Sequence, residues 1–152
     1  MIPAVVNIKG MKAKIKRIDK ALPLPEYKTP GAAGLDCSAR ETTVAEPGKL
    51  TLVPLNVCIK PPKNHYVMLA ARSSLPKKGL MLANGIGIGD EDFSGNKDEY
   101  RAAIYNFTDK PVTIERGDRI AQIIFRPYEK IEWEEVNDME KESRGGFGST
   151  GI

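Results

Sequence analysis

The alternation of apolar and polar positions predicts a chain of short β-strands separated by turns. Residues 13–16 and 112–114 alternate between the two kinds of position. Residues 66–70 and 120–125 are short, nearly continuous apolar runs, which are typical of strands that are buried on both faces. The remaining strands are expected at residues 42–44, 50–53, 57–59 and 131–133.

Proline and glycine mark the breaks between these segments. Pro47 and Gly48 form a turn sequence, the pair Pro61–Pro62 ends a strand, and a turn is expected at residues 116–118. Residues 22–30 are rich in proline and predict an extended loop.

A helix is predicted only at residues 73–79. Ser73 is suited to cap its start, Pro76 falls in its first turn, and Gly79 falls at its end. The backbone N–H groups of its first turn would point in the same direction as Ser73.

Many short strands in 152 residues predict one all-β domain. The chain is 41% hydrophobic but only 7% aromatic, so we expect one modest core filled by aliphatic side chains. A sandwich, a jelly roll and a closed barrel all fit this pattern, which does not separate them. We favour a jelly-roll barrel or sandwich with one short helix.

The two ends differ from the middle. We expect residues 1–10 to be an N-terminal extension, 11–136 the β domain, and 137–152 a polar, glycine-rich arm that is mobile until a ligand or partner orders it. No apolar run approaches the roughly 20 residues of a membrane span. The first residues also lack the basic region of a signal peptide, so we expect a cytoplasmic protein that contacts no membrane.

Charge and cysteine content exclude some functions. The net charge of +3 comes from interspersed signs, which does not indicate a nucleic-acid-binding protein but is compatible with a polyphosphate substrate. Cys37, Cys58 and the single histidine, His65, lack zinc-ligand spacing. We expect two buried thiols in a reducing compartment, although the sequence leaves one disulfide open.

The candidate chemistry is that of phosphates. The chain has no phosphate-binding loop of the G-x-x-x-x-G-K type, and its G-x-G-x-x-G at residues 146–151 follows no βαβ unit. Glycine turns, hydroxyls and arginines remain, and these groups hold phosphates through N–H and O–H donors. A carboxylate can orient a water molecule for attack on phosphorus, while Mg²⁺ is held mostly by phosphate and water.

Residues 84–95 are the richest segment for such chemistry. Three glycines alternate with isoleucines, so the backbone can approach a flat ligand, and Asp90, Glu91 and Asp92 follow. Composition alone also fits a surface hairpin with an acidic tip, just as the glycine-rich arm also fits plain disorder.

Five segments carry a further signal, and they occur in the order 30–36, 72–75 with 78–80, 84–95, 117–122 and 144–151. Together they resemble the motifs of the trimeric dUTPase family, and the likeness spans about residues 11 to 152. The resemblance implies a homotrimer of jelly rolls whose three active sites are shared between subunits. It also implies hydrolysis of dUTP to dUMP and pyrophosphate by in-line attack of water on the α-phosphorus. Mg²⁺ would be held by the triphosphate and water without a direct protein ligand. By the same resemblance, the reaction would keep uracil out of DNA and supply dUMP for thymidylate synthesis.

The resemblance also assigns roles to residues of this chain. Asp90 would be the general base, Phe93 would lie under the deoxyribose and reject UTP, and Asp36 would organise the site. The residues implied to read the uracil edge are Asn84, Gly85 and Gly87. Those implied at the phosphates are Arg72, Ser73, Ser74 and Gln122. Those implied in the closing arm are Arg144, Phe147, Gly148, Ser149 and Thr150.

This chain departs from the family pattern at four places. Phe93 stands where tyrosine is usual, Ser74 stands where glycine is common, residues 96–101 lengthen the third motif, and the fifth motif is short after Arg144. Three other functions stay open: a dCTP deaminase of the same fold, a nucleotide-binding β protein without catalysis, and a structural jelly roll. The complete fifth motif and the acids after Gly89 favour a dUTPase.

Overall fold

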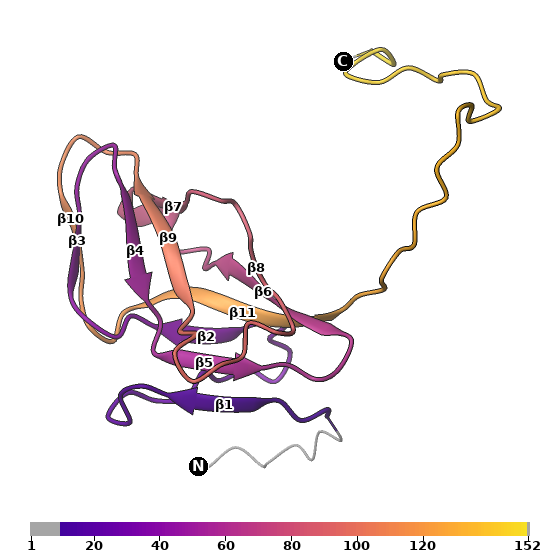
Figure 1. Ribbon diagram of the computed structural model, residues 1–152. Coiled ribbons are helices and arrows are strands. Elements are labelled where there is room, and N and C mark those ends of the chain that lie inside the picture. The colour runs from indigo at the N-terminus through magenta and orange to yellow at the C-terminus, as the bar shows by residue number, and fades with distance from the viewer. Residues whose placement is uncertain (1–9, 152) are drawn as a thin grey trace.

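The computed structural model describes residues 10–151, and in that range the regular secondary structure is almost entirely β (Figure 1). The strands are β1 (Lys14–Arg17), β2 (Leu35–Ser38), β3 (Thr43–Ala45), β4 (Leu50–Pro54), β5 (Val57–Lys60), β6 (His65–Ala71), β7 (Leu80–Leu82), β8 (Gly87–Gly89), β9 (Arg101–Asn106), β10 (Val112–Ile114) and β11 (Arg119–Pro127). No helix within the described range is long and apolar enough to cross a membrane.

The strands form antiparallel sheets that pack as a jelly roll. The largest sheet has the order β2-β11-β6-β8, and a second has the order β4-β9-β7. Two further pairs, β1-β5 and β3-β10, complete the body (Figure 1). Strand β11 lies between β2 and β6, which brings segments far apart in the sequence side by side.

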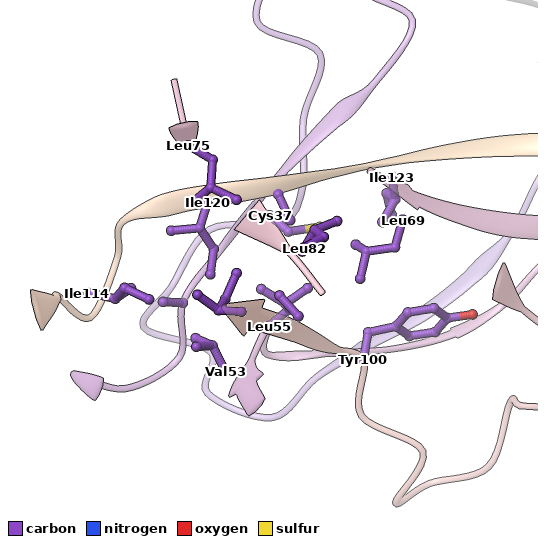
Figure 2. Close-up of a cluster of buried hydrophobic side chains, with 14 of the residues drawn as sticks. Cys37, Val53, Leu55, Leu69, Leu75, Leu82, Tyr100, Ile114, Ile120 and Ile123 are labelled. Atoms are coloured by element: carbon purple, nitrogen blue, oxygen red, sulfur yellow. The ribbon is translucent and has the colours of Figure 1, made fainter. Parts of the chain in front are cut away.

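The core lies between the inner faces of these sheets, and aliphatic residues fill it as the composition predicted. Strand β9 shows the underlying period of two: Ala102 and Ile104 are buried, whereas Ala103 and Tyr105 are only half-buried. The large, fully buried aliphatic residues, several of them drawn in Figure 2, are Val53, Leu55, Val57, Ile59, Val67, Leu75, Leu80, Ile104, Ile114, Ile120 and Ile123.

Most predicted strands are confirmed within one or two residues, but β2, β7, β8 and β9 were not anticipated. The predicted helix is a single 3₁₀ turn over Pro76–Lys78. The serine cap was wrong: Leu75 occupies the N-cap position and makes no side-chain cap bond. Gly79 ends the turn as expected, in the left-handed conformation with φ 78°.

The strand expected at 131–133 does not form. Residues 129–151 contain no strand, and every one of them is exposed. Trp133 is 90% exposed and Ile131 is 71% exposed, because no strand among residues 10–151 lies beside them. Figure 1 shows this C-terminal arm running from the end of β11 away from the sheets. Residues 1–9 of the predicted N-terminal extension lie outside the described range.

Both cysteines are buried and unpaired, so the open question of a disulfide is settled. Burial, with a smaller contribution from the Asp36 carboxylate, raises the pKa of Cys37 to about 12. Such a thiol stays protonated and packs as a small apolar group.

Candidate functional site

The third-motif segment folds back along strand β6. Strand β8 pairs antiparallel with β6, so that Gly87 lies opposite Leu69 and Gly89 lies opposite Val67. Gly85 turns the chain with φ 69°, a conformation that favours glycine. A Cβ atom on Gly87 would lie 3.1 Å from the Cβ of Leu69. Glycine at this position therefore keeps open a narrow space beside β6.

A hollow of about 400 Å³ lies along this strand. Its lining brings together three residues that the sequence assigned to substrate, Asn84, Gly87 and Phe93. Leu69 and Tyr100 lie in the same wall. Glycine main chain, one amide and two aromatic rings thus form part of the wall, and these groups suit a flat heterocycle and its sugar. The rest of the lining is Leu69, Ile88 and the charged residues Lys97, Glu99 and Arg101.

The acidic residues after β8 line a wider hollow of about 930 Å³. The Tyr128 hydroxyl and the Asn64 backbone N–H donate hydrogen bonds to the Glu91 carboxylate, at 2.8 and 2.9 Å. These two bonds lower the pKa of Glu91 from its ordinary value. Asp90 is exposed, and the described residues place no hydrogen bond or ion pair on its carboxylate. Asp90 is therefore free to bind a water molecule.

A separate cationic cluster forms where β2, β6 and β11 meet. The carboxylate of Asp36 is 3.2 Å from Arg72 Nε and 3.0 Å from Arg119 Nη1. Only 11% of the Asp36 side chain is exposed, whereas Arg72 and Arg119 are 26% and 42% exposed. The shared carboxylate therefore fixes two partly exposed guanidinium groups, and Arg72 Nη1 also donates to the carbonyl oxygen of Arg119 at 2.9 Å. Two neighbouring guanidinium groups held at the surface suit an anion.

Gln122 and the second-motif serines lie beside this cluster. Gln122 of β11 lies opposite Asp36 of β2, and its side-chain amide donates a hydrogen bond of 3.0 Å to the carbonyl oxygen of Ala71. Its side chain occupies the space that a Cβ on Gly34 would need. Ser73 is exposed, and Ser74 accepts a hydrogen bond of 3.4 Å from Arg72.

Strand β6 separates the two groups of residues. Because Val67 lies opposite Gly89, Asp90 leaves β8 near the start of β6, whereas Arg72 follows its end. The distance from Tyr66 to Arg72 along an extended strand is about 20 Å. Within one chain, Asp90 and the arginines are therefore too far apart to act on the same phosphorus atom.

The predicted arm residues lie apart from both groups. Arg144, Phe147, Gly148, Ser149 and Thr150 belong to the exposed arm, and Phe147 has no packing partner on the β body. The hydrogen bonds within 137–151, such as that from the Ser149 N–H to the carbonyl oxygen of Gly146, are local.

Sequence reasoning missed three features of the site. The sequence assigns Arg119 no role beyond membership of the fourth motif, whereas its side chain reaches Asp36 and belongs to the cationic cluster. The bond between Tyr128 and Glu91 has no local signal, because 37 residues separate the partners. Tyr100 falls in the insertion at residues 96–101, for which the sequence predicts no role.

An aromatic hollow of this size, with paired guanidinium groups on the same β domain, defines the class as a nucleoside-phosphate-binding jelly roll. A family model described as dUTPase matches residues 20–151. The chain belongs to the dUTPase family, and it is a hydrolase of nucleotide metabolism.

Relatives and solved structures agree with this membership. The chain is 41% identical over 152 residues to a deoxyuridine 5'-triphosphate nucleotidohydrolase of Desulfitobacterium hafniense, covering 94% of this chain and 98% of that protein. It is 39% identical over 148 residues to the protein of that name from Anaplasma marginale, covering 93% and 99%. The crystal structure of a dUTPase from Streptococcus mutans superposes with a TM-score of 0.71 at 32% identity, covering 78% of this chain and 98% of that one.

Proposed function

We propose that this protein hydrolyses dUTP to dUMP and pyrophosphate by attack of water on the α-phosphorus, with Mg²⁺ bound to the substrate. The observation that carries the proposal is the glycine-lined hollow along β8, with Asn84 and Phe93 in its wall and Asp90 at the end of the strand. In the cell, this reaction would keep uracil out of DNA and supply dUMP for thymidylate synthesis.

The pocket supports recognition of the base largely through the main chain. Gly85 and Gly87 let the backbone approach a flat ring, and the Asn84 amide adds one donor and one acceptor. A close backbone wall leaves little room for the methyl group of thymine. The Phe93 ring, 39% exposed, offers a flat surface under the sugar, where a 2′-hydroxyl would be crowded.

Asp90 would serve as the general base. Its carboxylate is exposed and is not held by an ion pair within the described range, so it can accept a proton from an attacking water. The Mg²⁺ carried by the substrate would supply positive charge against the negative charge that develops on the phosphates. Both oxygens of Asp36 already contact arginines, which fits a metal carried by triphosphate and water.

The cationic cluster would hold the phosphates. Arg72 is preorganised by Asp36, and Ser73, Ser74 and Gln122 lie around it. Fixed guanidinium donors stabilise the charge of a leaving pyrophosphate without reorganising during the reaction.

Two observations support the proposal of a homotrimer with shared sites. The first is the separation of about 20 Å along β6 between Asp90 and the arginines, which a neighbouring subunit would resolve. The second is the outer face of the sheet β4-β9-β7, where Leu50 and Met81 both pair with Tyr105, and Leu52 pairs with Ala103. Leu50, Leu52 and Met81 are 60%, 53% and 45% exposed, so one chain leaves a contiguous apolar face uncovered.

The arm would close the site of another subunit. Phe147 would cover the uracil, Arg144, Ser149 and Thr150 would contact the γ-phosphate, and Gly148 would bind substrate in the same segment. An exposed arm with glycines at 145, 146, 148 and 151 can order over a ligand, exclude water and release product when it opens.

The deciding assay incubates the purified protein with dUTP and Mg²⁺ and follows dUMP and pyrophosphate. We expect stoichiometric release of both products. Release of ammonia from dCTP would instead indicate a deaminase, and binding of dUTP without pyrophosphate release would indicate a non-catalytic nucleotide-binding protein.

A further inference from the structure

Tyr100 lines the hollow along β8, and its side chain is buried. Among the described residues, its hydroxyl is the one buried side-chain polar atom without a hydrogen-bond partner. Only 4% of the residue is exposed, and its hydroxyl neither donates nor accepts a hydrogen bond there. Burial, assisted by the carboxylates of Asp90 and Asp98, raises the pKa of Tyr100 to about 12, so the hydroxyl stays neutral. An unpaired buried hydroxyl destabilises the folded state, and a phenylalanine at this position would avoid that loss.

The ring of Tyr100 fills the space that a side chain at position 89 would occupy. A Cβ built on Gly89 would overlap the Tyr100 hydroxyl oxygen and would lie 2.6 Å from the ring atoms Cε1 and Cζ. The tyrosine ring therefore packs directly beneath the backbone of β8 (Gly87–Gly89). Figure 2 shows it at the edge of the core cluster, with its hydroxyl directed away from the aliphatic side chains.

Tyr100 also contacts the ring that faces the sugar in the proposed function. The centroids of Phe93 and Tyr100 are 5.4 Å apart, and the ring planes meet at 76° in an edge-to-face contact. This geometry is the favourable one for two aromatic quadrupoles. It fixes the tilt of Phe93, whose exposed face borders the hollow.

The backbone around Tyr100 is rigid, because the loop that carries it is tied to the core. The Tyr100 N–H donates to the carbonyl oxygen of Val57 at 2.8 Å, and its own carbonyl accepts from Leu55 N–H at 2.9 Å. The preceding residue, Glu99, accepts hydrogen bonds from Arg40 Nε at 2.7 Å and from the Asn56 N–H at 3.0 Å. The 96–101 insertion thus delivers a firmly held ring to the pocket.

We propose that Tyr100 is a positioning residue for sugar selectivity: its ring supports Gly89 from below and holds Phe93 at the angle that excludes a 2′-hydroxyl. This proposal rests on the proposed function and extends it to a residue outside the five motifs. It assigns a role to the ring, so the hydroxyl is dispensable.

The test compares kcat/KM for dUTP with kcat/KM for UTP in three variants. Tyr100→Leu removes the ring, Tyr100→Phe keeps the ring without the hydroxyl, and Ile114→Ala destabilises the core on the distant strand β10 as a control. We expect the dUTP preference to fall about 10-fold in Tyr100→Leu and to stay unchanged in the other two. Tyr100→Phe should also melt at a higher temperature than the wild type.

A double-mutant cycle tests whether Tyr100 acts through Phe93. In a Phe93→Ala background, Tyr100→Leu should cause no further loss of dUTP preference, because the ring it positions is gone. An unchanged preference in Tyr100→Leu, or a reduced preference in Tyr100→Phe, would overturn the positioning role while wild-type dUTP hydrolysis stands. Absence of dUTP hydrolysis in the wild type would overturn both proposals.

Discussion

At the scale of single residues, backbone space decides which side chains can share the site. Gly34 leaves room for Gln122, and Gly89 leaves room for Tyr100. Asp36 sits between two arginines and orients both. Each pairing joins residues that are distant in sequence, so a substitution at one partner acts through the other.

Replacing Asp90 with asparagine should abolish the proton acceptor while keeping the shape of the site. We expect kcat to fall at least ~10²-fold, the usual scale for a lost general base, with binding of a non-hydrolysable dUTP analogue retained. Steady-state kinetics and calorimetric titration measure the two effects. Asp109→Asn, an exposed carboxylate in the loop after β9, serves as the control. Equal turnover in Asp90→Asn and wild type would remove Asp90 from the mechanism.

Replacing Gly89 with alanine should force the new methyl group into the Tyr100 ring. Overpacking of this kind costs typically about 1–3 kcal/mol of unfolding free energy. Chemical denaturation measures the loss. Gly31→Ala is the matched control, because a Cβ there meets nothing within 4 Å. Equal stability of the two variants would show that the Gly89 contact relaxes without cost.

At the scale of elements, short strands gain their positions from hydrogen bonds and from contacts between loops. Strand β8 has three residues, and its glycines contribute little packing. It is held by β6 along one side and by Tyr100 beneath. Beyond its end, Glu91 links the segment to Asn64 and to Tyr128 after β11.

The Glu91 link should make stability depend on pH in the acid range. Its pKa is lower in the folded state than the ordinary value of 4.5, so its contribution is present above that pH and is lost as pH falls through the folded pKa. Glu91→Gln should therefore lower the melting temperature at neutral pH and flatten its decline below about pH 4.5. Thermal melts across this range measure both. Glu129→Gln, an exposed carboxylate, should leave the curve unchanged.

Deletion of residues 144–152 should separate catalysis from folding. The arm contributes no buried residue within 137–151, so the melting temperature should stay at the wild-type value. If the arm closes over the triphosphate, kcat/KM for dUTP should fall about 10²-fold, since its donors and its exclusion of water are lost. A collapse of the melting temperature would instead identify the arm as a structural element.

At the scale of the whole molecule, the exposed apolar face of β4-β9-β7 and the separation of Asp90 from the arginines both favour an assembly over a lone chain. A monomer would leave Leu50, Leu52 and Met81 in contact with water. Association through this face would bury them, and burial of apolar area contributes about 25 cal/mol per Å².

Leu52→Lys should dissociate the assembly, because burying an unpaired ammonium group is unfavourable. Light scattering should report a trimer for the wild type and a monomer for the variant, and dUTP hydrolysis should fall with dissociation. Thr113→Lys, on the exposed side of β10, should remain a trimer. A monomeric and fully active wild type would contradict the shared-site proposal.

The sequence by itself determined the all-β class, most strand positions and the family motifs, because alternation and turn residues are local signals. It did not predict β8, whose glycines lack a strand pattern, and it placed a strand at 131–133, where the described part of the chain offers no partner strand. Only the tertiary structure showed that Arg119 shares Asp36 with Arg72 and that Tyr100 packs under Gly89. These contacts join distant segments, and their geometry depends on strand register, which one-dimensional patterns do not contain.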